Sequence, residues 1–406
     1  MRVQLVLSLK HSMVAGIVQI AVGDQQSIIL KRDGSVWSAG DNQYGQLGHG
    51  STLSSLNFVS AIMSDANGVV VGKEHSMVLK LDGSVWASGH NHYGQLGDGS
   101  TADKSAFVKV LHDDVIALVA GLYHSMALKQ DGSVWATGRN DCGQLGDGTT
   151  TSRNSFVQVE SEGVKSFATG ACHSMILKED GSVWGTGSNS FGQLGIGLLN
   201  VGNTVVFREV FEIDDVAMVA AGAHHSLLIL HDGSIWATGR NLFGQLGDGS
   251  RITKNAFAPV ITSGAKAVAA GHSYSMVLTQ DGSVWATGSN LHGQLGDGST
   301  TDKNAFVQVI PSNAKTICVV AGYSHSMILT DDDRVWATGW NLYGQLGDGS
   351  ITAKSTFMLV AELGDNRLPP GDAVIAKAPS PGEKRAITCL VCSVQVFCSI
   401  MFFHDS

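Results

Sequence analysis

The four residues Gly-Gln-Leu-Gly occur seven times in this chain, and successive copies are always about fifty residues apart. The copies begin at Gly45, Gly94, Gly143, Gly192, Gly244, Gly293 and Gly344. A period of this length predicts a repeat architecture, in which each unit buries its apolar surface against its neighbours. The number of domains therefore follows from the repeat, and not from the total length of 406 residues.

Each repeat contains four short apolar segments and shows no helical periodicity. In the third repeat they are 116–121, 125–129, 133–138 and a run that begins at Phe156. Asp131-Gly132 separates the second segment from the third and is typical of a tight hairpin, because both residues tolerate positive φ. The seventh repeat has Asp333-Arg334 instead, which predicts a different turn there. Four strands per repeat predict an all-β fold, a seven-bladed β-propeller of four-stranded blades over residues 16–362.

The order of the repeats suggests how the ring closes. The first Phe-containing segment follows the first Gly-Gln-Leu-Gly, so that blade one, beginning near Val18, has no such segment before it. We therefore expect the C-terminal strand Phe357–Val360 to pair with blade one. Closure of this kind would remove the sheet edges that invite aggregation.

Residues that recur in every repeat are interpreted as architecture. One tryptophan per repeat is expected to pack between adjacent blades, at Trp37, Trp86, Trp135, Trp184, Trp236, Trp285 and Trp336. A His-Ser pair opens the second strand at His75, His124, His173, His225 and His325, whereas Gln26 and Tyr274 take the histidine position in the other two blades. That substitution argues against a metal ring, and we expect each imidazole to bond to the backbone of the neighbouring blade.

One pair of positions changes together among the repeats. Five repeats carry an aspartate after Gly-Gln-Leu-Gly and a base six residues later, in the pairs Asp98 and Lys104, Asp147 and Arg153, Asp248 and Lys254, Asp297 and Lys303, and Asp348 and Lys354. The other two repeats lack both members. We therefore expect five ion pairs, each contributing about 0–1 kcal/mol if exposed. Calcium binding would require further carboxylates nearby.

Composition excludes some classes of partner. The net charge is −9 and no basic run is present, so a nucleic-acid partner is not favoured. The six cysteines show no disulfide framework, which suggests a reducing compartment. Cys389 and Cys392 form a Cys-x-x-Cys without the second half of a zinc site. We expect no cofactor and no metal.

The two ends of the chain differ from the repeats. Residues 1–15 form an N-terminal segment that matches a signal peptide weakly. Residues 363–385 contain prolines and are interpreted as a linker, and residues 386–406 form a hydrophobic tail. The run 386–403 is marginally long enough to span a bilayer. It is either a tail anchor or a spurious gene end. The expected location is cytoplasmic, with nuclear or membrane-tethered alternatives.

The segment Gly121–Gly146 carries the pattern Gly-x-x-His-Ser, apolar strand, Asp-Gly, strand, Gly-x-Asn-x-x-Gly-Gln-Leu-Gly. This pattern resembles the repeat of the regulator of chromosome condensation family over about residues 16–361. The resemblance implies a seven-bladed propeller. It also offers several functions, since the founding member is an exchange factor for the small GTPase Ran that also contacts chromatin, while another relative inhibits a β-lactamase purely by binding. The photoreceptor relative carries tryptophans between the Gly and the His, and none occurs there in this chain.

Positions that differ between repeats are the candidate binding residues. One set lies between the repeated Gly and His, and the other follows the tryptophan strand; together they supply Glu74, Tyr123, His224, Tyr323, Arg139, Arg240 and Trp340. Near-symmetry offers no single catalytic cluster, so we expect no enzyme. The predicted function is a monomeric protein-interaction scaffold. The alternative is a guanine-nucleotide exchange or regulatory factor for a small GTPase.

Overall fold

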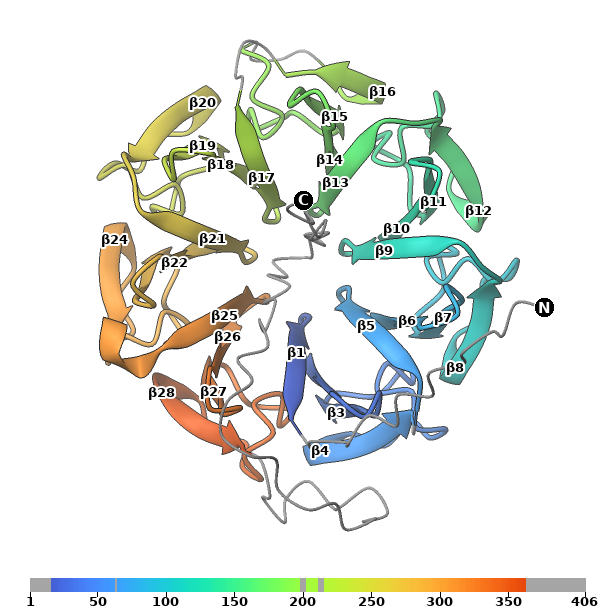
Figure 1. Cartoon of the computed structure of the whole chain (residues 1–406), viewed down its shortest axis with the longest axis horizontal. Coiled ribbons are helices and arrows are strands. Elements are labelled where there is room, and N and C mark those ends of the chain that lie inside the picture. The colour runs from blue at the N-terminus through green and yellow to red at the C-terminus, as the bar shows by residue number, and fades with distance from the viewer. Residues whose placement is uncertain (1–15, 63, 198–201, 211–214, 363–406) are drawn as a thin grey trace, which may run out of the picture.

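Seven four-stranded antiparallel sheets surround a central axis, as Figure 1 shows. The computed structural model describes residues 16–62, 64–197, 202–210 and 215–362. Within each sheet the strand order follows the chain, so that blade 1 consists of β1 to β4 and blade 7 of β25 to β28. The predicted seven-bladed β-propeller is confirmed.

Four concentric sets of strands make up the ring. The inner strands are β1 (Ile17–Val22), β5 (Ala66–Val71), β9 (Val115–Ala120), β13 (Val164–Thr169), β17 (Val216–Ala221), β21 (Ala265–Ala270) and β25 (Thr316–Ala321). The second strands are β2 (Gln26–Lys31), β6 (His75–Lys80), β10 (His124–Lys129), β14 (His173–Lys178), β18 (His225–Leu230), β22 (Tyr274–Thr279) and β26 (His325–Thr330). The third strands are β3 (Val36–Gly40), β7 (Val85–Gly89), β11 (Val134–Gly138), β15 (Val183–Gly187), β19 (Ile235–Gly239), β23 (Val284–Gly288) and β27 (Val335–Gly339). The outer strands are β4 (Ser55–Ile62), β8 (Lys104–Leu111), β12 (Arg153–Glu160), β16 (Thr204–Glu209), β20 (Lys254–Ile261), β24 (Lys303–Ile310) and β28 (Lys354–Ala361).

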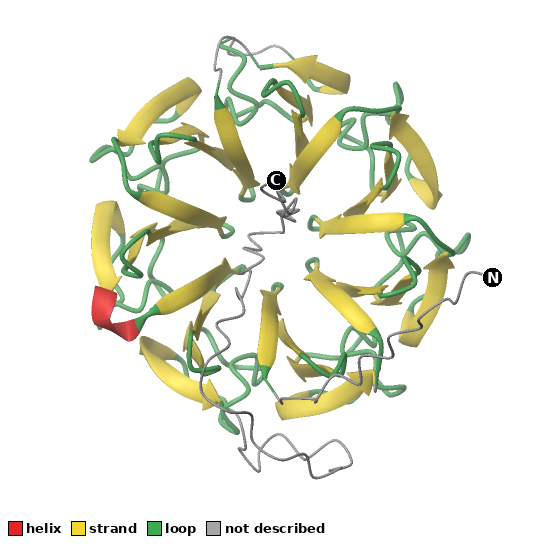
Figure 2. Ribbon diagram, viewed as in Figure 1, coloured by secondary structure: helices red, strands yellow, loops and turns green. Residues whose placement is uncertain are grey.

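Helical structure is limited to one short turn in the described residues, η1 (Ser312–Ala314), which Figure 2 shows at the edge of the ring. No helix in this part of the chain is both long and apolar enough to cross a membrane. The predicted N-terminal segment 1–15, linker 363–385 and hydrophobic tail 386–406 lie outside the described residues.

The predicted closure by Phe357–Val360 is wrong. These residues belong to β28, which pairs with β27 of its own blade in a register that includes Val335 with Ala361. Blade 1 has its own outer strand, because the long loop after β3 returns the chain to pair Ser55 with Gly40. The seventh seam is closed by a loop: the amide of Gly349 donates to the carbonyl of Leu56 at 3.0 Å.

Each seam between blades is filled by a phenylalanine of one blade and a glycine of the preceding one. At the second Gly of the first Gly-Gln-Leu-Gly loop, Gly48, an added Cβ would lie 2.1 Å from the ring of Phe107 in blade 2. Gly347 of blade 7 stands in the same relation to Phe58 of blade 1, at 2.3 Å. Each repeated phenylalanine therefore lies in the outer strand of its own blade, and its ring packs against the loop of the preceding blade.

The repeated tryptophans pack between blades as predicted. Trp37 is 4% exposed and shares a core cluster with Val320 and Met327 of blade 7. The indole N–H donates to Ser35, and the Lys31 ammonium lies 4.2 Å from the ring centroid. Burial of such a side chain contributes up to about 5 kcal/mol.

The buried histidines link neighbouring blades through serine. Nε2 of His75 lies 2.9 Å from the hydroxyl of Ser125 in the next blade, and that hydroxyl donates to the carbonyl of Gln95. Since the serine proton is used on Gln95, the imidazole must donate from Nε2. The predicted neighbouring blade is confirmed, whereas the acceptor is a side chain and not the backbone.

The turn of the seventh blade keeps the geometry of the others. Asp333, and not Arg334, occupies the position that Gly34 holds in blade 1, and it adopts a φ of +62°. Its amide donates to Thr330 as that of Gly34 donates to Lys31. The prediction of a different turn was wrong, because aspartate also tolerates the left-handed region.

We expect Gly97→Ala to destabilise the ring more than Gly99→Ala. Both glycines have left-handed φ, +78° and +83°, so both variants carry a backbone strain of about 1–2 kcal/mol. At Gly97 a Cβ would also lie 2.4 Å from the ring of Phe156, whereas at Gly99 the nearest atom is 3.8 Å away. Overpacking should add about 1–3 kcal/mol at Gly97 alone, measurable by denaturant unfolding. Equal losses would show that the Phe contact does not hold the seam.

Stability should fall as the pH drops below about 6.5. Burial, followed by the charges of His90 and His124, lowers the pKa of His75 to about 3. The unfolded chain therefore binds a proton that the folded one does not, and the stabilisation is complete above pH 6.5 and lost toward pH 3. Each histidine with such a lowered pKa reduces the free energy of unfolding by about 1.4 kcal/mol for every pH unit in that window. Unfolding midpoints at pH 7.5 and 5.5 measure it, and His75→Gln should reduce the slope; a flat profile would contradict the assignment.

Candidate functional site

Two sets of loops meet at the same end of every blade and form what we call the loop face. One set joins the inner strand to the second strand, and the other follows the third strand. Backbone hydrogen bonds of 2.8 Å join them, for example from the amide of Arg139 to the carbonyl of Tyr123 and from that of Arg240 to His224. All seven predicted site residues lie on this face.

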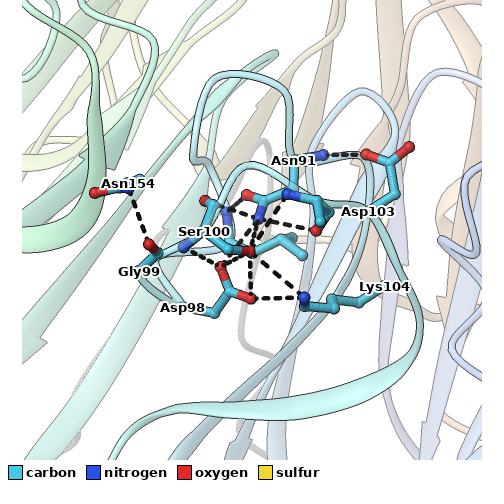
Figure 3. A network of polar contacts seen from close by, with 9 residues as sticks. Asn91, Asp98, Gly99, Ser100, Asp103, Lys104 and Asn154 are labelled. Carbon is cyan, nitrogen blue, oxygen red and sulfur yellow. Dashed lines mark hydrogen bonds and ion pairs between the residues drawn. The ribbon is translucent and has the colours of Figure 1, made fainter.

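A polar network holds each long loop after the third strand, as Figure 3 shows for blade 2. The side-chain amide of Asn91 donates to Asp98 at 3.0 Å and its carbonyl accepts from the amide of Leu96. Asp98 also accepts from the amide of Ser100 and pairs with Lys104 at 3.1 Å. Burial would raise the pKa of Asp98, but the bonds from Ser100, Lys104 and Asn91 outweigh it and hold the pKa low.

The five predicted acid–base pairs are confirmed, at N···O separations between 2.7 and 3.5 Å. They are less exposed than expected, because the Asp98 side chain is 10% accessible. The loops that present the variable residues are therefore rigid platforms, which lowers the entropy that binding would cost.

Three predicted residues come together over blades 2 and 3 with two that sequence analysis missed. We call Lys73, Glu74, Tyr93, Tyr123 and Arg139 the polar cluster. Nζ of Lys73 donates to the Tyr123 hydroxyl at 2.6 Å and lies 3.4 Å from Glu74. The rings of Tyr93 and Tyr123 are 5.2 Å apart, and the Arg139 guanidinium lies 5.4 Å from the former.

A cavity lies on the axis at the centre of the loop face. Its wall consists mostly of glycine and alanine, and its polar edge includes Asp24, Lys73, His272 and Tyr323. Asp24 is 7% exposed, and burial raises its pKa to about 6, with Glu74 adding to the effect and Lys73 opposing it.

His90, His92 and Asp103 have ligand atoms within 4.8 Å of one another, a spacing at which a metal ion could be held. Nδ1 of His90, however, lies 2.7 Å from the side-chain nitrogen of Gln95, whose oxygen is already used by the amide of Tyr93. Nδ1 therefore accepts, and the proton sits on Nε2. A metal at Nε2 would have to displace it, so we assign no metal to this cluster.

A second group of residues gathers around the axis at blades 5 and 6. We call His224, Arg240 and His272 the basic cluster. Burial, followed by the charge of Arg240, lowers the pKa of His224. The pKa of His272 falls to about 4, again through burial first and then through His224 and Arg240. Tyr323 joins this group, since its ring lies 4.0 Å from that of His272.

Trp340 is separate from the other predicted residues. It stacks on His292 of blade 6, with centroids 5.4 Å apart and planes at 22°, and meets Tyr343 edge-on. It is half-buried, not fully exposed as a lone loop tryptophan would be.

Sequence analysis missed a third position that lies on the loop face. The residue before each Gly-Gln-Leu-Gly is aromatic in most blades: Tyr44, Tyr93, Phe191, Phe243, His292 and Tyr343, with Cys142 in blade 3. The aromatic preference was visible in the repeats, but recurrence at one position was taken as a sign of packing alone.

We expect Asp98→Ala to loosen its loop and Lys104→Met to leave it intact. Removing the carboxylate leaves the backbone amide of Ser100 without its acceptor and takes away one of the acceptors of Asn91, at a cost of about 1–3 kcal/mol. Removing the ammonium loses a partly exposed pair worth at most about 1 kcal/mol. Hydrogen exchange at the amides of residues 96–100, together with unfolding midpoints, tests the difference. Equal effects would mean that the ion pair, and not the amide network, holds the loop.

Comparison with known proteins agrees with the repeat and the geometry. A family model of the RCC1-like domain matches residues 2–304 and 106–389. Human WBSCR16 is similar in structure, with a TM-score of 0.70 and 21% identity over 77% of this chain and 86% of that one. Yeast RCC1 (Prp20) bound to Kap60 has a TM-score of 0.72 and is 18% identical over 86% of this chain and 84% of that one. A second structure of Prp20p, from Saccharomyces cerevisiae, has a TM-score of 0.70 and is 21% identical over 81% of this chain and 86% of that one. These likenesses establish the fold, and the family model spans more than half of the sequence. The chain therefore belongs to the family of RCC1-like domains.

Proposed function

We propose that this protein is a monomeric, cytoplasmic protein-binding module that recognises its partner with the loop face and performs no covalent chemistry. One observation carries the proposal. Residues that hold the ring together recur from blade to blade, whereas the residues that differ, such as Tyr123, Arg139 and Trp340, gather on one face. Tyrosine, tryptophan and arginine are the types that supply most of the binding energy at protein interfaces.

The charge of the chain supports a protein partner and not a nucleic acid. The net charge is −9, and phosphate backbones require clustered positive charge. On the loop face, Lys73 is paired with Glu74, and Arg139 with Asp141. Mixed charge among aromatic rings suits a folded protein surface.

Regulation of a small GTPase, including nucleotide exchange, is the second candidate. Membership of the RCC1-like family favours it. So does the likeness to Prp20p, whose structure was described together with its binding of Gsp1p and histones. Successive Gly-Gln-Leu-Gly motifs are 49 to 52 residues apart, which leaves little room for a long projecting loop. Exchange would therefore have to use the loop face itself.

We expect the double variant Tyr123→Ala/Arg139→Ala to lose partner binding about a hundred-fold, because two anchors of the polar cluster are removed together. A protein array and a panel of purified small GTPases provide the partners, with binding and nucleotide release measured on both the intact chain and the variant. Leu81→Ser is the control, since Leu81 is 70% exposed beside the Asp82-Gly83 hairpin at the opposite end of the blade.

The outcomes separate the two candidates. Binding that depends on the polar cluster without faster nucleotide release supports the binding module. Faster release from one GTPase, abolished by the double variant, replaces it with the second candidate. Binding that every loop-face variant leaves unchanged removes both.

A further inference from the structure

Leucines break the symmetry of the loop face over three consecutive blades. Leu242, Leu291 and Leu342 occupy the same position, one residue after the repeated asparagine, in blades 5, 6 and 7. Their exposed fractions are 51%, 71% and 53%. We call these three residues the leucine arc. Blades 1 to 4 have Gln43, His92, Asp141 and Ser190 at this position, so the arc is confined to one side of the ring.

Further exposed apolar side chains lie in the loops that follow the third strand in blades 5, 7 and 1. Ile252 of blade 5, Ile351 of blade 7 and Leu53 of blade 1 are 68%, 56% and 74% exposed. The carbonyls of Ile252 and Leu53 accept from the asparagine of the same loop, which fixes them on the rigid platform described above. Exposed apolar side chains that recur in the same loops of successive blades indicate a docking surface.

Trp340 connects the arc to the inner part of the face. It belongs to blade 7 and stacks on His292 of blade 6, beside Leu291 in the chain. Phe243 follows Leu242 directly and lies 5.9 Å from the Arg240 guanidinium. Leu242 and Phe243 therefore connect the leucine arc to the basic cluster along the chain.

The basic cluster lacks an acidic counterpart in the described part of the chain. Arg240 forms no ion pair there, and its Nε is buried without a hydrogen-bond partner, as is Nδ1 of His224. The corresponding loop positions of blades 4 to 6 are Ala171, Cys172, Ser188, Ala223, Ser273 and Ser289, none of them acidic. By contrast, Arg139 at the equivalent position of blade 3 pairs with Asp141.

An uncompensated guanidinium against aromatic rings is poised for an anion. Arg240 lies 5.2 Å from the ring of Phe191, which holds the fork in place. A carboxylate matches this planar fork, because its two oxygens can accept two parallel hydrogen bonds from the guanidinium.

We propose that the leucine arc and the basic cluster together bind a protein segment that carries apolar side chains and one carboxylate. The apolar side chains cover the arc, and the carboxylate reaches Arg240 beside Phe191. The inference rests on the proposed binding function and deepens it by naming the side of the face and the chemistry of the partner.

The test uses a library of displayed twelve-residue peptides selected on the full-length protein. Enriched peptides should combine at least two apolar residues with an aspartate or glutamate. Their synthetic forms should bind about ten-fold or more weakly to Arg240→Gln, because a charge-assisted bond is lost. Leu291→Ser should weaken binding several-fold, and Arg240→Lys should fall between Arg240→Gln and the intact protein because it keeps the charge without the fork.

Two controls match the test variants. Arg334→Gln removes an exposed arginine that pairs with Asp332 at the hairpin end of blade 7, and Leu81→Ser removes an exposed leucine at the hairpin end of blade 2. Neither should alter peptide affinity. Unfolding midpoints of all variants show whether the fold is intact. Acetate and inorganic phosphate, titrated separately while the His224 and His272 imidazole signals are followed by NMR, distinguish a carboxylate site from a phosphate site.

Each result decides the proposal. Acid-containing apolar peptides that depend on Arg240 and Leu291 support it, as does a rise in both histidine pKa values with acetate. Peptides without an acid, binding unaffected by Arg240→Gln, or a response to phosphate alone would overturn it. Peptides that depend on Tyr123 and not on Arg240 would leave the binding module standing and remove only this inference. No enrichment, or binding insensitive to every loop-face variant, would remove both.

Discussion

The packing of one phenylalanine ring under the neighbouring blade's Gly-Gln-Leu-Gly loop is the contact on which the ring depends. It occurs at all seven seams, including the one where Gly347 covers Phe58 and the end of the propeller meets its beginning. A Cβ at the glycine would overlap the ring, and the glycine also has positive φ, so that the motif cannot vary at this position without moving two blades apart. Closure therefore needs no exchanged strand, because the loop of each blade already reaches across to the next.

Hydrogen bonds between buried side chains reinforce six of these seams. Five histidines and Tyr274 each contact a serine of the next blade, and the serine hydroxyl donates a hydrogen bond to a glutamine backbone carbonyl of the preceding blade. The seam between blades 1 and 2 differs, because the side-chain amide of Gln26 has no hydrogen-bond partner among the described residues. There Gln19 exchanges two hydrogen bonds of 3.0 Å with the backbone of Val69, which replaces the missing link at a different level of the same interface.

Sequence periodicity was sufficient to predict the strands, the blade count and the ion pairs, because those features repeat and their physical cause is local. The closing strand was predicted wrongly because one residue has two roles. Phe357 lies in a strand of its own blade and packs on the preceding one, and a sequence pattern cannot separate pairing from packing. Asp333 was misaligned because its left-handed φ is shared with the glycine that it replaces. The contacts of the candidate site were beyond prediction for a different reason: Lys73 and Tyr123 lie on neighbouring blades, and only the curvature of the ring brings them together.

A ring with seven equivalent seams offers few places where sequence can differ without opening it. The Asp-Gly hairpins at one end are repeated, and the first three strands of each blade are mostly buried, so the loop face is a surface on which blades become distinct. The distinction is not random along the ring. Blades 2 and 3 carry charges that are already satisfied within the molecule, such as Lys73 beside Glu74, whereas blades 5 to 7 carry exposed leucines next to an arginine without a carboxylate. A surface whose charges are already paired within the molecule gains little binding free energy from a charged partner. One that leaves a buried guanidinium nitrogen unpaired gains most when a partner supplies the missing acid. The physical asymmetry between the two sides of the ring therefore points to blades 5 to 7 as the side where binding energy is available.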